Sequence, residues 1–211
     1  MNQRSSINIY NQDCMEAMKQ MSDNEFDLAI VDPPYGISVN HNMGRRKGDK
    51  SSDYKLAYWD KEPPPKEYYL ELFRVSKNQI IWGANHFISR MPYDSSCWLV
   101  WDKGFSEMVS FAQFELAWTS FESTCKKYNK HPNTKEHRIH PTQKPVQLYK
   151  WLLTNYAKEG DKILDTHLGS GSIAIACWDL KFDLTGYEID KEYYDNAMER
   201  IERHKRQLNL F

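Results

Sequence analysis

The chain has 211 residues, of which 40% are hydrophobic and 27% charged, a balance that predicts one compact domain with a substantial core. Its formal net charge is -1, so any binding to nucleic acid has to come from local basic patches. The four cysteines have no CxxC spacing, which argues against a zinc site, any other metal centre and a disulfide framework. No membrane-spanning run and no signal peptide stand out, so we expect a cytoplasmic protein without a membrane partner.

Strands and helices are predicted to alternate along the chain. A short strand at 7–10 precedes a helix that begins near Asp13, which has capping-box spacing to Glu16. Further strands are expected at 27–31, 79–82, 98–101, 114–118, 162–165 and 184–188, and further helices at about 66–76, 145–156, 172–178 and 191–208. This alternation predicts an α/β fold: a Rossmann-like, doubly wound and mostly parallel sheet with helices on both faces.

The apolar run 27–31 ends at Asp32-Pro33-Pro34-Tyr35, which we call the DPPY turn. Two prolines stop the strand, so the turn should expose Asp32 and Tyr35 at the carboxyl end of the strand, where open α/β sheets bind ligands. A carboxylate and a fixed carbonyl can accept both hydrogens of an exocyclic amine, while an aromatic ring stacks on the base that carries it. The alternative is an Asp-Pro turn followed by a packing tyrosine.

A second motif, Gly169-Ser170-Gly171, follows the strand 162–165 and opens a helix; we call it the glycine turn. It has the G-x-G-x-x-A form of a nucleotide-binding turn, and Glu188 follows about 20 residues later, where ribose hydroxyls are bound. The pattern also fits two alternatives. One is an NAD-dependent oxidoreductase, and the other is a structural turn whose glycines only allow the strand and the helix to pack closely. Asp165 beside the turn favours a cationic ligand group over a pyrophosphate.

Three motifs in this order, at 32–35, 140–145 and 165–171, resemble the beta group of DNA amino-methyltransferases. The resemblance runs from about Ile7 to Ile201 and suggests a small phage-like or orphan-like member, whether or not a restriction-modification partner accompanies it. It implies S-adenosylmethionine as the cofactor and double-stranded DNA as the substrate, and it leaves open a homodimer. One domain over 1–211 would carry a mobile loop at about 36–65 and a small target-recognition insertion at about 102–139.

The resemblance also implies roles for individual residues. Asp32 and the Pro33 carbonyl would bind the target amine within the turn completed by Pro34, and Tyr35 would stack on the flipped base. The cofactor would be bound by nine residues: Asp13, Thr142, Lys144, Asp165, His167, Gly169, Ser170, Gly171 and Glu188. In this set Lys144 is placed at the methionine carboxylate, and Asp13 either receives the adenine amine or caps a helix. His167 replaces the phenylalanine common in the family, and it is either a titrating group beside the cofactor or a satisfied structural histidine.

Aspartate at the first position of the DPPY turn favours adenine N6 over cytosine N4, because cytosine-N4 members usually carry serine there. An RNA or protein amino-methyltransferase, and a non-catalytic DNA-binding remnant, are the remaining alternatives. Phosphate contacts are predicted from two basic loops, which contain Arg45, Arg46, Lys47, Lys126, Lys127 and Lys130. The basic residues of the last helix, Arg200, Arg203, Lys205 and Arg206, are expected to form a solvated face.

Overall fold

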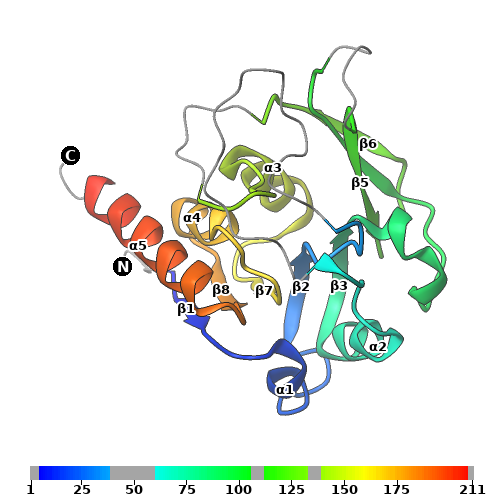
Figure 1. Cartoon of the computed structure of the whole chain (residues 1–211), viewed down its shortest axis with the longest axis horizontal. Coiled ribbons are helices and arrows are strands. Elements are labelled where there is room, and N and C mark those ends of the chain that lie inside the picture. The colour runs from blue at the N-terminus through cyan, green and yellow to red at the C-terminus, as the bar shows by residue number, and fades with distance from the viewer. Residues whose placement is uncertain (1–4, 39–59, 106–111, 133–138, 209–211) are drawn as a thin grey trace.

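The computed structural model describes residues 5–38, 60–105, 112–132 and 139–208. Eight strands form one sheet, and five helices and two short 3-10 turns connect them within these ranges (Figure 1). The strands are β1 (Ile7–Tyr10), β2 (Phe26–Val31), β3 (Ser76–Trp82), β4 (Trp98–Asp102), β5 (Phe114–Thr119), β6 (Lys126–Asn129), β7 (Lys162–Asp165) and β8 (Asp183–Tyr187). The helices are α1 (Cys14–Met18), α2 (Lys66–Val75), α3 (Val146–Tyr156), α4 (Ser172–Leu180) and α5 (Lys191–Leu208).

The sheet has the strand order β1-β8-β7-β2-β3-β5-β4-β6. From β1 to β3 all neighbours are parallel, whereas β5 pairs antiparallel with both β3 and β4. The predicted α/β fold with a mostly parallel sheet is therefore confirmed. Because β2 and β7 are adjacent and parallel, the DPPY turn and the glycine turn both emerge at the carboxyl edge of the sheet, side by side.

Two apolar cores lie on opposite faces of the sheet. Residues of α3, α4 and α5 pack on one face, and Leu148, Leu152 and Ile201 are among their buried side chains. Residues of α1 and α2 pack on the other face, where Tyr69 and Leu72 are fully buried. Helices thus cover both faces, as Figure 1 shows, and strands buried on both sides explain the continuous apolar runs in the sequence.

One strand was not predicted. β6 has the sequence Lys-Lys-Tyr-Asn, which carries no apolar alternation, and it is held only as an edge strand parallel to β4. Both β5 and β6 fall within the range 102–139 that we assigned to a target-recognition insertion, and both are strands of the main sheet. The role of this range in target recognition stays a prediction. Most of the predicted loop at about 36–65 lies outside the described residues.

In the parts of the chain that the structure describes, no helix is long and apolar enough to cross a membrane.

Candidate active site

Two buried residues, Asp60 and Gly83, hold the DPPY turn in place, and the exposed His86 stacks on it. Asp60, only 1% exposed, accepts hydrogen bonds from the backbone N–H groups of Tyr35 (2.8 Å) and Gly36 (3.0 Å) through one carboxylate oxygen. Gly83, at the end of β3, lies directly against the Tyr35 ring. His86 stacks on the same ring, with centroids 5.2 Å apart and planes 16° apart. The turn therefore presents Asp32 and Tyr35 in a defined orientation.

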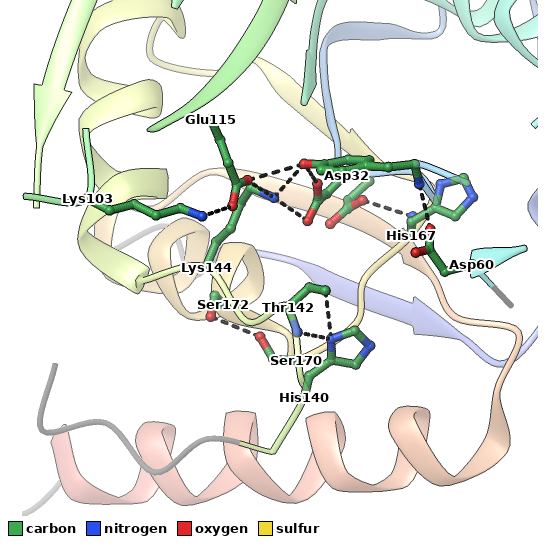
Figure 2. A network of polar contacts seen from close by, with 12 residues as sticks. Asp32, Asp60, Lys103, Glu115, His140, Thr142, Lys144, His167, Ser170 and Ser172 are labelled. Atoms are coloured by element: carbon green, nitrogen blue, oxygen red, sulfur yellow. Dashed lines mark hydrogen bonds and ion pairs between the residues drawn. The ribbon is translucent and has the colours of Figure 1, made fainter. Parts of the chain in front are cut away.

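Both oxygens of the Asp32 carboxylate have partners within the protein (Figure 2). The Tyr35 hydroxyl donates to Asp32 Oδ1 at 2.7 Å, and the Lys144 ammonium lies 2.5 Å from Asp32 Oδ2. Lys144 also donates to the Tyr35 hydroxyl at 3.1 Å, and its side chain is only 2% exposed. In this structure Lys144 therefore contacts the DPPY turn, although the resemblance places it at the cofactor's carboxylate, and that assignment stays a prediction.

Two residues that we did not predict complete this group. Glu115 on β5 places Oε2 at 3.1 Å from the Lys144 ammonium, and its Oε1 forms an ion pair of 2.7 Å with Lys103. Together with Asp32, Tyr35 and Lys144 they form what we call the carboxylate–lysine cluster. The only signal in the sequence is a charged residue inside the apolar strand 114–118, and this signal does not indicate the strand's neighbours.

Opposing influences set the charges in the cluster. Burial raises the pKa of Asp32, and the Lys144 ammonium acts in the opposite direction. Burial also acts to raise the pKa of Glu115, but Lys144 and Lys103 outweigh it and lower the pKa to about 2. Burial lowers the pKa of Lys144, yet Asp32 and Glu115 outweigh it and raise the pKa. Lys144 is therefore a buried cation that depends on two carboxylates.

The glycine turn lies beside this cluster, and Glu188 holds it in place. Glu188 Oε2 accepts a hydrogen bond of 2.8 Å from the Gly169 N–H, and its Oε1 accepts one of 2.9 Å from the Asp190 N–H. Gly169 and Gly171 have φ values of +51° and +71°, which glycine adopts without strain. Gly171 also packs against Ile201, where a Cβ would lie 3.1 Å from the isoleucine. Gly169 thus allows the turn, and Gly171 both allows the turn and lets α5 pack closely against it.

The prediction of a solvated face on the last helix is wrong for one residue. Arg200 is only 6% exposed, because its guanidinium turns inward and donates to the Ser170 carbonyl oxygen (2.7 Å) and to Ser172 Oγ (2.9 Å). Arg200 therefore supports the glycine turn from behind and is not exposed to a phosphate.

Thr142 is anchored by His140. The Thr142 N–H and its hydroxyl lie 3.3 Å and 3.1 Å from His140 Nδ1, and the histidine ring packs on Tyr193 with centroids 4.3 Å apart. Burial lowers the pKa of His140 to about 4, so the ring is neutral near pH 7 and can accept the Thr142 N–H.

A cavity of about 670 Å³ joins the two turns. This is a size typical of small-ligand sites. Its lining brings together eight of the predicted residues: Asp32, Pro34, Thr142, Lys144, His167, Gly169, Ser170 and Glu188. It also includes residues that we did not predict: His140, Gln143, Tyr149, Leu168, Ile189, Asp190 and Tyr193. The predicted residues Asp13, Pro33, Tyr35, Asp165 and Gly171 are not among the lining residues in the described part of the chain.

Asp13 and Asp165 each have a structural contact. Asp13 caps α1, accepting a 2.7 Å hydrogen bond from the Met15 N–H, which confirms the capping alternative; its contact with a cofactor stays a prediction. Asp165 is 1% exposed and accepts the His167 N–H at 2.9 Å. Burial, reinforced by the negative charges of Asp32 and Glu188, raises the pKa of Asp165 to about 8.

His167 lines the cavity but also has partners on its inner side. Its Nδ1 lies 2.9 Å from Thr166 Oγ1 and 3.5 Å from the Tyr68 hydroxyl. Burial lowers the pKa of His167 to about 4. His167 is therefore a neutral, hydrogen-bonded histidine, which agrees with the alternative of a structural histidine rather than a titrating group.

Only part of the predicted DNA contact surface is described. Lys126, Lys127 and Lys130 are exposed on or beside β6, at the edge of the sheet. Lys127 forms an ion pair of 3.3 Å with Asp102, and Lys126 lies 5.4 Å from the centre of the Tyr156 ring. The other predicted loop, with Arg45, Arg46 and Lys47, lies outside the described residues. The described residues contain no cluster of three or more His, Cys, Asp or Glu that could hold a metal ion.

Known proteins are similar to this chain in sequence and in fold. A family model described as DNA methylase, of the N6_N4_Mtase type, matches residues 81–199. The chain is 25% identical over 236 residues to the type II methyltransferase M.HpaI of Haemophilus parainfluenzae, covering 89% of this chain and 72% of the relative. The chain therefore belongs to the DNA methylase family and is a DNA methyltransferase of the N6/N4 type.

Solved structures share the fold at low sequence identity. The M1.HpyAVI–SAM complex matches with a TM-score of 0.60 and 20% identity, over 92% of this chain and 99% of the other. The PvuII DNA methyltransferase, which is cytosine-N4-specific, matches with a TM-score of 0.63 and 11% identity, over 98% and 94% of the two chains. These similarities establish the methyltransferase fold and leave the target base open.

Proposed function

We propose that this protein transfers a methyl group from S-adenosylmethionine to the N6 amine of an adenine that is flipped out of double-stranded DNA. One observation carries the proposal: the Asp32 carboxylate and the glycine turn with Glu188 line the same cavity. A carboxylate that can bind an amine thus lies beside a turn suited to a nucleoside cofactor.

The residues of the cavity fit this cofactor. Glu188 can accept hydrogen bonds from ribose hydroxyls, and the apolar side chains of Leu168, Ile189 and Tyr193 can pack against the adenine ring. Thr142 and Ser170 line the cavity and carry hydroxyl groups that can donate hydrogen bonds to the methionine part. When bound, the cofactor supplies an electrophilic methyl group on a sulfonium. The M1.HpyAVI structure with a similar fold was solved as a complex with SAM.

The chain's own groups would prepare the target amine. An exocyclic amine is a weak nucleophile, because its lone pair is delocalised into the ring. Asp32 and the Pro33 carbonyl can accept its two hydrogens and localise the lone pair, after which Asp32 can take the proton that is released. Tyr35 offers an aromatic face to the flipped base, which offsets part of the lost stacking. Catalysis would then rest mainly on orientation and electrostatics.

Adenine N6 is favoured by Asp32 at the first position of the DPPY turn, as the resemblance implies. Cytosine N4 is the second candidate, because the PvuII DNA methyltransferase, which has a similar fold, is cytosine-N4-specific. A cytoplasmic location and a role in restriction-modification accompany this proposal, and a homodimer is compatible with it.

The test is methylation of duplex DNA with labelled S-adenosylmethionine, followed by nucleoside analysis. We expect N6-methyladenine from the wild-type protein, and no product from Asp32→Ala with cofactor affinity retained. N4-methylcytosine would overturn the base assignment alone. An Asp32→Ala protein that methylates at the wild-type rate would overturn the role of Asp32. Tight NAD binding without a response to S-adenosylmethionine would overturn the cofactor.

A further inference from the structure

The Lys144 ammonium lies against Asp32, which is the carboxylate that methyl transfer needs for the target amine. The Lys144 ammonium has three N–H donors, and Asp32, Glu115 and the Tyr35 hydroxyl take all three, at 2.5, 3.1 and 3.1 Å. An ammonium in contact with Asp32 Oδ2 competes with a target amine for that oxygen. It also weakens the carboxylate as an acceptor of the amine's proton. Lys144 therefore has to leave Asp32 Oδ2 before a target amine can bind to that oxygen.

Glu115 is placed to receive this charge. Its Oε2 already lies within ion-pair distance of Lys144, so the lysine can exchange one carboxylate for the other with a small movement of its flexible chain. The second oxygen of Glu115 is held by Lys103 from the end of β4, which keeps the carboxylate in place. The two carboxylates and two ammonium groups of the cluster balance in charge, and this balance is unchanged when Lys144 turns from Asp32 to Glu115. Asp32 then keeps its hydrogen bond from the Tyr35 hydroxyl and is open to the target amine.

We propose that Glu115 is a positioning residue for this reaction: it takes over the Lys144 ammonium when the target's amino group binds Asp32. The inference rests on the proposed function, because it assumes that Asp32 receives an amine. Lys144 thus occupies the place of the target amine until the base arrives, and Glu115 makes its release possible.

Several other groups face Lys144 and enter any dependence on pH. Outside the five members of the cluster, the titratable groups of the described residues whose charges interact with it are His140 on the loop of Lys144, Tyr149 on α3 and Asp165 on β7. His140 is neutral near pH 7 and the pKa of Tyr149 is raised by burial, so neither changes charge between pH 7 and 9.5. Asp165, with a pKa of about 8, changes charge in wild type and variant alike, and a ratio of their rates removes its effect.

The variant that tests this is Glu115→Gln, with the exposed Glu122→Gln as the matched control. We expect the single-turnover rate of Glu115→Gln to fall about 30-fold or more, because Asp32 is then the one carboxylate of the cluster that can pair with Lys144. Cofactor affinity, measured by calorimetry, should change less than the rate. The loss of the Glu115 charge should lower the pKa of Lys144, so a rise in pH from 7 to 9.5 deprotonates Lys144 more in the variant than in the wild type. Because a neutral Lys144 releases Asp32, the rate relative to wild type should recover over this range. A ratio that is constant with pH would show a merely structural role and overturn the inference.

A measurement without turnover separates this inference from the proposed function. NMR of lysines labelled with ¹³C, with the Lys144 signal assigned by its loss in Lys144→Met, should give a lower pKa for Lys144 in Glu115→Gln than in wild type. An unchanged pKa overturns the inference even if the enzyme methylates adenine. If Glu115→Gln does not fold, Glu115→Asp keeps the charge, and its rate should lie between those of wild type and the amide variant; a wild-type rate would contradict the inference. A wild-type protein that methylates no DNA would instead overturn the proposed function.

Discussion

Gly83 lies against the phenol ring of Tyr35 so closely that a Cβ on Gly83 would overlap the ring atoms. Gly83 also has a φ of +71° and donates its N–H to the Leu116 carbonyl at 2.9 Å. The end of β3 is thereby fixed to β5 while its surface supports the ring of the DPPY turn. The position of the Tyr35 ring depends on the absence of a side chain at Gly83.

Gly83→Ala should therefore displace the Tyr35 ring and lower methylation strongly. The change also places alanine at positive φ, which costs about 1–2 kcal/mol of stability. Gly160→Ala is a matched control, because Gly160 has a φ of +88° and open space where its Cβ would lie. Thermal unfolding of Gly160→Ala measures the cost of the positive φ alone, to which Gly83→Ala adds the overlap with the Tyr35 ring. Initial rates should show a large loss of activity in Gly83→Ala only. Equal activity in the two variants would contradict the role of this contact.

Glu188→Gln should weaken the binding of S-adenosylmethionine. Glu188 orients the glycine turn through Gly169 and offers a charged acceptor to the cavity. Replacing a charge-assisted hydrogen bond costs about 1.5–3 kcal/mol, which corresponds to a dissociation constant raised about 10- to 150-fold. Calorimetry measures this directly, and Glu199→Gln on the exposed side of α5 serves as the control. An unchanged dissociation constant would remove Glu188 from the cofactor site.

The sequence was sufficient to predict the fold and the two turns, because both rest on local signals. Apolar runs, prolines and glycines mark where strands stop, and parallel strands bring such stops to one edge. The position of Lys144 could not be predicted from the sequence, because its ion pair joins residues 32 and 144, which are 112 positions apart. Glu115 and Lys103 were missed for the same reason: β5 enters the sheet antiparallel beside β3, and no local pattern indicates that pairing.

Asp165→Asn should raise stability in the absence of cofactor near pH 8. The folded-state pKa of Asp165 is raised to about 8, whereas the unfolded value is about 4. The stability that the protonated group contributes is present below about pH 4 and is lost as the pH rises toward 8, since the unfolded chain ionises first. A neutral amide avoids this loss, and each kcal/mol regained raises Tm by about 2–4 °C.

Differential scanning calorimetry at pH 5 and pH 8 checks this expectation. The difference in Tm between Asp165→Asn and wild type should grow with pH, while the exposed control Glu159→Gln should show no such trend. If Asp165 lies near the cofactor's ammonium, the same variant should bind S-adenosylmethionine more weakly. A difference in Tm that is independent of pH would contradict the raised pKa.

Affinity for DNA should depend on the lysines on and beside β6. Replacing Lys126, Lys127 and Lys130 together by alanine should reduce the slope of log affinity against log salt by about 0.9 for each phosphate that the variant no longer neutralises. The control is the pair Arg203→Ala and Arg206→Ala, exposed on α5. Fluorescence anisotropy over a series of salt concentrations gives both slopes. A larger change in the α5 control than in the β6 variant would move the predicted DNA surface to the last helix.

Tyr35 carries two functions that two substitutions can separate. Tyr35→Ala removes the ring and should weaken capture of the flipped base by about 1–3 kcal/mol, seen as a raised KM for DNA. Tyr35→Phe keeps the ring on Gly83 and His86 but removes the hydroxyl that donates to Asp32 Oδ1 at 2.7 Å. A hydrogen bond to a charged group is worth about 1.5–3 kcal/mol, so kcat should fall about 10- to 150-fold while KM stays near the wild-type value. Steady-state kinetics on a duplex substrate distinguishes the two patterns. A Tyr35→Phe enzyme with wild-type kcat would mean that the hydroxyl does not orient the Asp32 carboxylate during the reaction, and that Tyr35 acts through its ring alone.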